Sequence, residues 1–197
     1  MEYEVDKCSF RFTFNPLPLR HNDVIIRDSP IEGKGLFATK KIPKGVVVTF
    51  YPVDALATTQ SISTYSTDKH FVNNARDYVD SHSYDLPPFG CNETQNDDCR
   101  RIVGNPRSLS NPLLLGHMIN DCSENVFLNV SYEEAIVLSR MKILLYTYFH
   151  KGRHRVNCDY VTNHYHNLVS IVTTKEIQEG EELMTYYDPS YWFCRAY

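Results

Sequence analysis

The feature that most constrains the fold is an acidic turn that leads into an aromatic strand near the end of the chain. Gly180 is followed by two glutamates and then by the apolar and aromatic residues 183–187. Glycine allows a tight turn that other residues rarely adopt, and the short apolar run after it is typical of a strand. The pattern predicts that the phenol of Tyr187 sits at a fixed point, five residues before Trp192.

A second informative glycine turn lies near the start of the chain. Gly33 and Gly35 flank Lys34, and the apolar residues 36–38 follow. Two glycines around one residue let the main chain bend sharply and approach a ligand closely, which a side chain would obstruct. The pattern suits a ligand-binding turn, although the same pair taken alone more often forms an ordinary hairpin.

Composition limits the class of protein. The 197 residues, 42% of them hydrophobic and 22% charged, suit one domain with a sizeable core. A net charge of -4 argues against a surface built to grip nucleic acid. Residues 1–22 show no secretory pattern, and the longest apolar run carries charges, so we expect an intracellular protein without a membrane span.

The cysteines and histidines carry no metal signature. In an intracellular protein the six cysteines are expected to be reduced thiols, although their even number also fits disulfides. The spacings of Cys91, Cys99, His150, His154 and Cys158 match no standard zinc pattern. The sequence therefore predicts no metal site.

Most of the expected elements are short strands. Turn residues and β-branched runs predict them at residues 23–26, 35–39, 46–51, 155–161, 168–173 and 183–187. The first three are expected to form a β-meander. Residues 52–112 are rich in Thr, Ser, Asn, Asp and Pro, which predicts a loop-rich insertion with too few periodic apolar residues for a core of its own.

One amphipathic helix is expected at residues 132 to about 150. Ser131 and Glu134 have the spacing of a capping box, in which each side chain accepts a hydrogen bond from the other residue's main chain. Apolar residues at helical spacing then define the buried face, namely Ala135, Leu138, Met141, Leu145 and Phe149.

Together the two turns and the residues between them resemble the SET-domain protein lysine methyltransferase family. The resemblance implies a mainly β (α+β) fold, made of short β-sheets around a knot-like core with one inserted amphipathic helix. The implied division of the chain is an N-terminal flank at residues 1–22, a SET-like domain at 23–192 with insertions at about 52–112 and about 131–153, and a short C-terminal tail at 193–197.

The family's motifs carry over to the matching positions of this chain. The Gly-x-Gly turn and the family's Asn-His pair hold S-adenosylmethionine, which implies as cofactor-binding residues Gly33, Lys34, Gly35, Leu36, Asn120, Asp121 and Trp192. Asp121 replaces the usual histidine of the pair. The next family element, a Pro-Asn-Cys or similar, is supplied either by Asn125 or by Asn157 with Cys158, and the paired strands that follow favour Asn157.

The strand after the acidic turn carries the strongest match to the family. Tyr187 takes the place of the catalytic tyrosine, and Tyr186 stands where an aspartate is usual. The resemblance also implies a substrate channel to which Tyr186, Thr185 and Tyr191 contribute. In such a site the tyrosine hydroxyl orients the lysine amine beside the donor methyl group.

The resemblance implies an S-adenosylmethionine-dependent protein lysine N-methyltransferase, with a histone tail in chromatin as the default substrate. A lysine side chain is protonated in water because its pKa is about 10.4, so a narrow and poorly solvated channel is expected to favour the neutral amine. Two alternatives stay open: a catalytically inactive SET-like module that binds a partner, and a methyltransferase of a non-histone protein.

Overall fold

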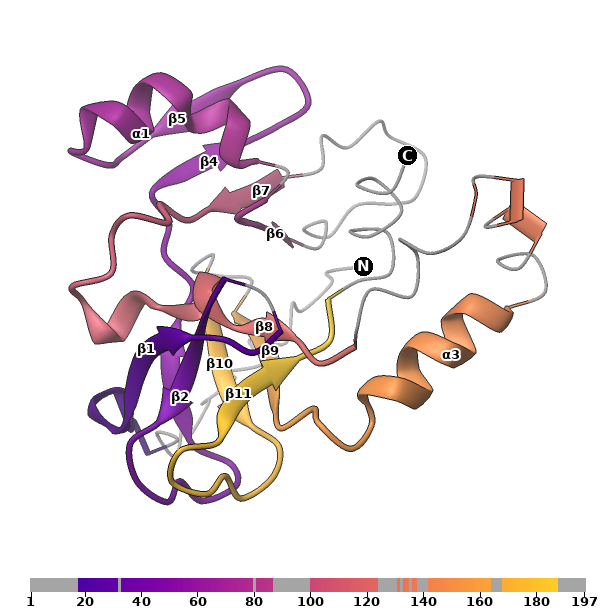
Figure 1. Ribbon diagram of the computed structural model, residues 1–197. Coiled ribbons are helices and arrows are strands. Elements are labelled where there is room, and N and C mark those ends of the chain that lie inside the picture. The colour runs from indigo at the N-terminus through magenta and orange to yellow at the C-terminus, as the bar shows by residue number, and fades with distance from the viewer. Residues whose placement is uncertain are drawn as a thin grey trace, which may run out of the picture.

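Three small sheets form the body of the molecule, and short helices pack around them (Figure 1). The computed structural model describes residues 18–31, 33–79, 81–86, 100–123, 131, 133–134, 136–137, 142–163 and 168–187. Within this part of the chain, no helix is long and apolar enough to cross a membrane. The mainly β architecture expected from the sequence is confirmed.

The first sheet joins segments from the two ends of the chain. Its strand order is β1 (Val24–Asp28), β2 (Lys34–Ala38), β11 (Glu182–Thr185) and β8 (Asn120–Asp121). β11 runs antiparallel to β2 and parallel to β8. Gly180 adopts a φ of 80° and donates its N–H to the Ala38 carbonyl at 2.8 Å, which aligns β11 with β2. The two turns found in the sequence therefore lead into neighbouring strands.

The second sheet has the order β3 (Val47–Phe50), β10 (Leu168–Thr173) and β9 (Cys158–Asn163), with antiparallel pairing throughout. The prediction of a β-meander is wrong, because β3 pairs with β10 and not with β2. Ile42 explains the change of sheet. It is fully buried and exchanges main-chain hydrogen bonds of 2.9 Å with Ile177, so the chain enters the core before β3 begins.

The main core collects buried aliphatic side chains from both of these sheets. Its members include Leu36, Ala38, Ile42, Val48, Ile119, Ile171, Ile177 and Leu183. Each buried side chain of this size contributes roughly 1.5–3 kcal/mol to folding. The 3-10 turns η1 (His21–Asp23), η3 (Pro112–Leu114) and η4 (Gly116–Met118) flank this core, and η4 leads directly into β8.

The third sheet has the order β5 (Ile62–Thr64), β4 (Ala55–Ala57), β7 (Arg100–Val103) and β6 (Ser83–Leu86), and it carries the helix α1 (Lys69–Asn74) and the 3-10 turn η2 (Ala75–Tyr78). The prediction of a loop-rich insertion without a core is wrong for these residues. Phe71 is fully buried in a cluster with Ala55 and Ala57. Alanines let the ring approach the sheet closely, and strands of three or four residues are too short to show a period in the sequence.

The expected helix of residues 132 to about 150 is not continuous. Its capping box is confirmed, since the Ser131 N–H donates to Glu134 Oε2 at 3.0 Å and the Glu134 N–H to Ser131 Oγ at 3.3 Å. Lys142, however, has a φ of 58°, and the helix α3 (Ile143–Gly152) begins only after it. The single helix is therefore a wrong prediction, because a residue in the left-handed region interrupts the helical ladder.

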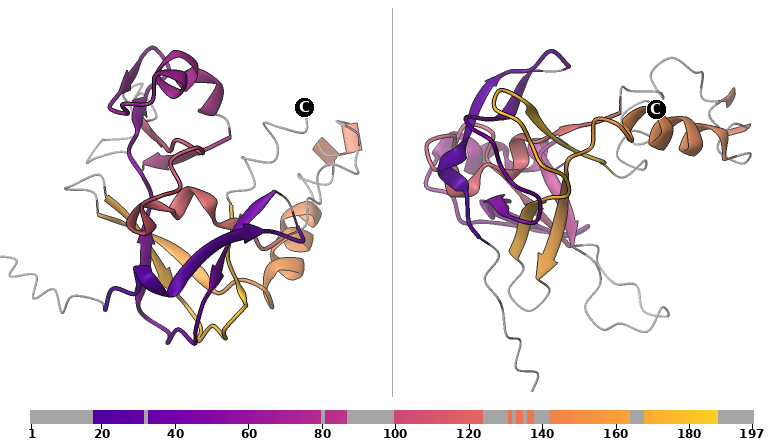
Figure 2. Two further views of the ribbon diagram at one scale, coloured as in Figure 1. Left: turned by 60° about the vertical axis from the view of Figure 1, so that its left-hand side comes forward. Right: turned by 90° about the horizontal axis from the view of Figure 1, so that it is seen from below.

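The interruption also changes which face of α3 is buried. Leu144, Tyr148 and Gly152 are buried, whereas the sequence pattern selected Leu145 and Phe149. Phe149 is 46% exposed. α3 stands out from the side of the sheets (Figures 1 and 2), and its last turn lies against the residues that follow β8 and β11.

Candidate functional site

The buried carboxylate of Glu182 ties the glycine turn to β8 and β11. Glu182 is 5% exposed. Its Oε2 accepts a hydrogen bond from Ser29 Oγ at 3.0 Å, and its Oε1 accepts one from Asn120 Nδ2 at 2.8 Å. Asn120 Nδ2 also lies 3.2 Å from the Lys34 carbonyl oxygen. A buried carboxylate needs such donors, and together they hold Lys34 and Asn120, two predicted cofactor-binding residues, in one place.

The two glycines of the turn have different physical roles. Gly33 has a φ of 53°, and a Cβ at this position would meet no atom within 4 Å. Gly35 is buried, and a Cβ there would lie 2.0 Å from Glu182 Oε1 and 3.0 Å from Asn120 Nδ2. Gly35 is thus required by packing within the protein. Gly33 is exposed and has free space where a side chain would stand, so the turn leaves room for a ligand.

Tyr187 is hydrogen-bonded to the residue that precedes Asn120. Its hydroxyl donates to the Ile119 carbonyl oxygen at 2.5 Å. Ile119 directly precedes Asn120, whose side chain reaches the glycine turn. The phenol of the expected catalytic tyrosine and the expected cofactor turn, more than 150 positions apart in the sequence, are therefore joined through two adjacent residues.

Asp121 directs its carboxylate into the protein. It is 4% exposed, and its Oδ1 accepts from the Ser123 N–H at 2.7 Å. Its Oδ2 accepts from the Tyr148 hydroxyl at 2.6 Å and from the Tyr187 N–H at 3.3 Å. The residue that stands at the family's histidine position thus supports the main chain of Tyr187.

The expected channel residues separate in the structure. Thr185 is buried within β11, and its carbonyl accepts from the Cys122 N–H at 2.7 Å. Tyr186 turns to α3, where its hydroxyl donates to the Phe149 carbonyl at 2.7 Å. Burial raises the pKa of Tyr186 to about 12, and the neighbouring Cys122 and Asp121 add to the effect. Tyr191, Trp192 and Asn125 lie outside the described residues, and Leu36 is a core residue.

Asn157 holds β11 from the side of the second sheet. It is 2% exposed. Its Oδ1 accepts from the Met184 N–H at 2.7 Å, and its Nδ2 donates to the Glu182 carbonyl at 2.8 Å. Asn157 also leads directly into β9, as the sequence interpretation that favoured it over Asn125 requires.

A cluster of three tyrosines was not found from the sequence. The ring centroids of Tyr84 and Tyr160 lie 4.9 Å apart, and those of Tyr51 lie 6.0 Å from Tyr84 and 6.3 Å from Tyr160. Burial raises the pKa of Tyr160, with smaller contributions from Tyr51, Tyr84, Cys158 and Asp121. The three tyrosines belong to a hydrophobic cluster with Ile102 and Val169. The available signal was Tyr160 itself, three residues after Asn157.

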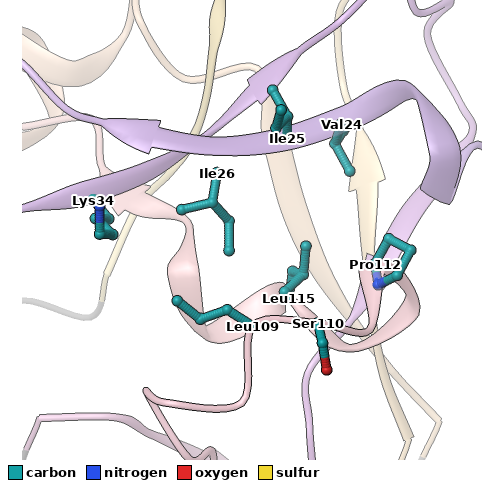
Figure 3. A pocket seen from close by; sticks show the side chains of 8 residues that line it. All are labelled: Val24, Ile25, Ile26, Lys34, Leu109, Ser110, Pro112 and Leu115. Atoms are coloured by element: carbon teal, nitrogen blue, oxygen red, sulfur yellow. The ribbon is translucent and has the colours of Figure 1, made fainter.

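A shallow groove of about 370 Å³ adjoins the glycine turn on the side of β1 (Figure 3). Ile26, Leu109 and Leu115 provide apolar walls, and Lys34 lies at one end. The Lys34 ammonium also forms an exposed ion pair of 3.0 Å with Asp28. Lys34 therefore contributes its main chain to the Asn120 side of the turn and its side chain to this groove.

Neither a metal cluster nor a reactive thiol is found in the described part of the chain. No group of three or more His, Cys, Asp or Glu residues there could hold a metal ion. Cys122 and Cys158 are buried free thiols. Burial raises the pKa of Cys122 to about 12, with a further contribution from Asp121. A thiol with so high a pKa is a poor nucleophile at neutral pH.

The sequence of this chain is similar to known proteins. The SET domain family model matches residues 33–188. SET domain-containing protein 9 from Pongo abelii is 28% identical over 166 residues, which cover 79% of this chain and 59% of that protein. The Homo sapiens protein of the same name is 27% identical over 164 residues, covering 79% and 54%. The chain thus spans less than two thirds of the length of these curated relatives.

Among solved structures, one similar chain is the ATXR5 SET domain in complex with histone H3 di-methylated on R26. It superposes with a TM-score of 0.48 and 16% sequence identity, and the match covers 85% of this chain and 58% of that chain.

Proposed function

This chain belongs to the SET domain family, and from that premise we propose that it is an S-adenosylmethionine-dependent protein lysine N-methyltransferase. The observation that carries the proposal is the hydrogen bond from the Tyr187 hydroxyl to the Ile119 carbonyl. It ties the phenol to the residue before Asn120, whose side chain donates to the Lys34 carbonyl of the glycine turn. A methyl donor on the turn and an amine at the phenol would then meet in one small volume.

The residues of the turn fit the cofactor that the family uses. The exposed main chain of Gly33 and Lys34 and the side chain of Asn120 would hold S-adenosylmethionine, which would supply the methyl group of its sulfonium. Glu182 keeps Asn120 in position through the 2.8 Å hydrogen bond. Because the carboxylate also accepts from Ser29, the shape of this cradle is defined before any ligand binds.

The tyrosines around the site suit an incoming lysine. A phenol that donates to a carbonyl can still accept a hydrogen bond, so the Tyr187 oxygen can orient the N–H of the amine. We further propose that the cluster of Tyr51, Tyr84 and Tyr160 forms a largely apolar wall of the lysine channel. Such surroundings favour the neutral amine, and aromatic faces also accept the cationic product.

The substrate that we propose is a lysine of another protein, with a histone tail as the first candidate by family membership alone. A non-histone protein is the second candidate. Incubation of the chain with radiolabelled S-adenosylmethionine and either purified histones or a cell lysate separates the two. Label on histones supports the first candidate, and label confined to other lysate proteins supports the second.

Substitution of Tyr187 tests the central claim. We expect Tyr187→Phe to lower the rate of methyl transfer by roughly 100-fold, the typical effect of removing one hydroxyl or amide that orients the reacting groups. Cofactor affinity measured by calorimetry should change little. Tyr146→Phe is the matched control, because Tyr146 is 71% exposed on α3. Unchanged turnover in Tyr187→Phe would contradict the assigned role.

A second candidate function is a binding module without turnover. The observation that favours it is Asp121, whose carboxylate replaces the family's histidine and is directed to Tyr148 and Tyr187. Calorimetry on the wild-type chain discriminates between the two functions. If the folded chain does not bind S-adenosylmethionine, the methyltransferase proposal fails and the binding module stands.

A further inference from the structure

The inserted helix α3 places a buried hydroxyl at the candidate site. Tyr148 is fully buried, and it is the largest such side chain in the described part of the molecule. Its hydroxyl lies within hydrogen-bond distance of two acceptors, Asp121 Oδ2 at 2.6 Å and the main-chain carbonyl oxygen of Tyr187. A phenol has a single proton to donate, so the Tyr148 hydroxyl bridges the carboxylate and the carbonyl.

Tyr148 and Asp121 together contact both main-chain polar groups of Tyr187. The Asp121 Oδ2 accepts from the Tyr187 N–H at 3.3 Å, while the Tyr148 hydroxyl lies against the Tyr187 carbonyl. The third polar group of Tyr187, its own hydroxyl, donates to the Ile119 carbonyl. The orientation of the phenol is thus set at its hydroxyl by the Ile119 carbonyl and at the main chain of Tyr187 by the Tyr148–Asp121 pair.

The last turn of α3 is tied closely to the same residues. The Ser123 Oγ donates to the Tyr148 carbonyl at 2.6 Å, and the Tyr186 hydroxyl donates to the Phe149 carbonyl at 2.7 Å. A Cβ at Gly152 would lie 2.5 Å from the Tyr186 ring and 2.6 Å from Ser123 Oγ. Only a glycine allows this approach, so the last turn of α3 packs directly against Tyr186 and Ser123.

We propose that Tyr148 and Asp121 form a positioning pair for Tyr187, through which the docked helix α3 sets the orientation of the catalytic phenol. The inference rests on the proposed methyltransferase function and adds to it a residue from outside the family's motifs. Neither member of the pair needs to touch the substrate. Its effect on turnover is transmitted through the main chain of Tyr187.

Two readouts test the pair. The first is turnover in Tyr148→Phe, which keeps the ring and removes the hydroxyl. We expect kcat to fall by about tenfold, the effect of one lost hydrogen bond. The affinity for S-adenosylmethionine, measured by calorimetry, should not change. In the second, the chain is produced with 3-fluorotyrosine, and the Tyr187 fluorine resonance is assigned from Tyr187→Phe. We expect this resonance to shift or broaden in Tyr148→Phe. Tyr146→Phe, on the exposed side of the same helix, should change neither readout.

The fluorine spectrum does not require turnover. The experiments can therefore refute the positioning pair without refuting the methyltransferase function, and the reverse. A wild-type chain that binds no S-adenosylmethionine overturns the methyltransferase, while the Tyr187 resonance still reports on the pair. An unchanged resonance in Tyr148→Phe, or an unchanged kcat in an active enzyme, overturns the pair. Should Tyr148→Phe fail to fold, Asp121→Ala removes both carboxylate acceptors of the pair, and the same two readouts decide.

Discussion

The side chain of Asn157 is expected to hold β11 in place, and its removal gives a measurable loss of stability. Asn157→Ala deletes the acceptor of the Met184 N–H and the donor to the Glu182 carbonyl, at 2.7 and 2.8 Å. Both main-chain groups lie in buried residues. A buried polar group that loses its partner costs about 1–3 kcal/mol, so we expect the free energy of unfolding to fall by about 2–5 kcal/mol.

The main-chain hydrogen bonds of residue 157 are kept in Asn157→Ala. The Asn157 N–H still donates to the Met184 carbonyl at 3.1 Å, and its carbonyl still accepts from the Thr174 N–H at 2.7 Å. The loss therefore reports on the side chain alone. Against a typical total stability of about 5–15 kcal/mol, a loss of this size is large, but it leaves most of the population folded in a domain of average stability.

Urea denaturation followed by circular dichroism measures the effect. With a slope of about 2 kcal/mol per molar urea, the middle of the typical range, the midpoint should fall by about 1–2.5 M at an unchanged slope. Asn74→Ala is the control, since Asn74 donates to the His70 carbonyl at the exposed surface of α1. A loss below about 0.5 kcal/mol in Asn157→Ala, the range of ordinary surface substitutions, would refute the reasoning.

Two further predictions follow from buried contacts. Gly35→Ala would bring a methyl group within 2.0 Å of Glu182 Oε1, so we expect calorimetry to show weaker S-adenosylmethionine binding and urea denaturation a loss of about 1–3 kcal/mol. The methyl group of Gly33→Ala would meet open space. This substitution should lower the free energy of unfolding only by the cost of a left-handed backbone in alanine, about 1 kcal/mol. A larger loss of stability in Gly33→Ala than in Gly35→Ala would contradict this. Burial, with a smaller contribution from His82, lowers the pKa of His117 from 6.5 to about 3. The unfolded chain binds this proton first, so stability should be fully present above pH 6.5 and fall as the pH drops toward 3, by on the order of 3 kcal/mol at pH 4. His117→Phe should remove this part of the pH dependence in urea denaturation, and an unchanged profile would count against it.

The strands were largely predictable because their signals are local. Turn residues such as Gly180 and β-branched runs mark where a strand begins and ends, and β10 (Leu168–Thr173) has the bounds expected from the sequence. The motif residues of the candidate site could be named from the sequence for the same reason. Gly33, Asn120 and Tyr187 each stand in a short motif, and a motif can be recognised without knowledge of the fold.

The remaining part of the site depends on contacts that no local pattern encodes. Tyr148 reaches Asp121 across 27 positions of the sequence. The tyrosine cluster draws Tyr51, Tyr84 and Tyr160 from three separate segments. The third sheet was missed because Ala55 and Ala57, which carry its core, have no strong preference for a buried strand. Burial at such positions is decided by the partner that packs on them.

The error in the helical segment and the gap in the predicted site have one physical origin. An unbroken helix turns by about 100° per residue, so the stripe begun at Ala135 and Leu138 would bring Leu145 and Phe149 to the protein. The left-handed conformation of Lys142 is incompatible with such a helix, and α3 begins after it. Its buried face then contains Tyr148 and, one turn later, Gly152. The side chain that meets Asp121 is therefore a phenol with a hydroxyl, where an unbroken helix would have presented the ring of Phe149 and left the carboxylate without that donor.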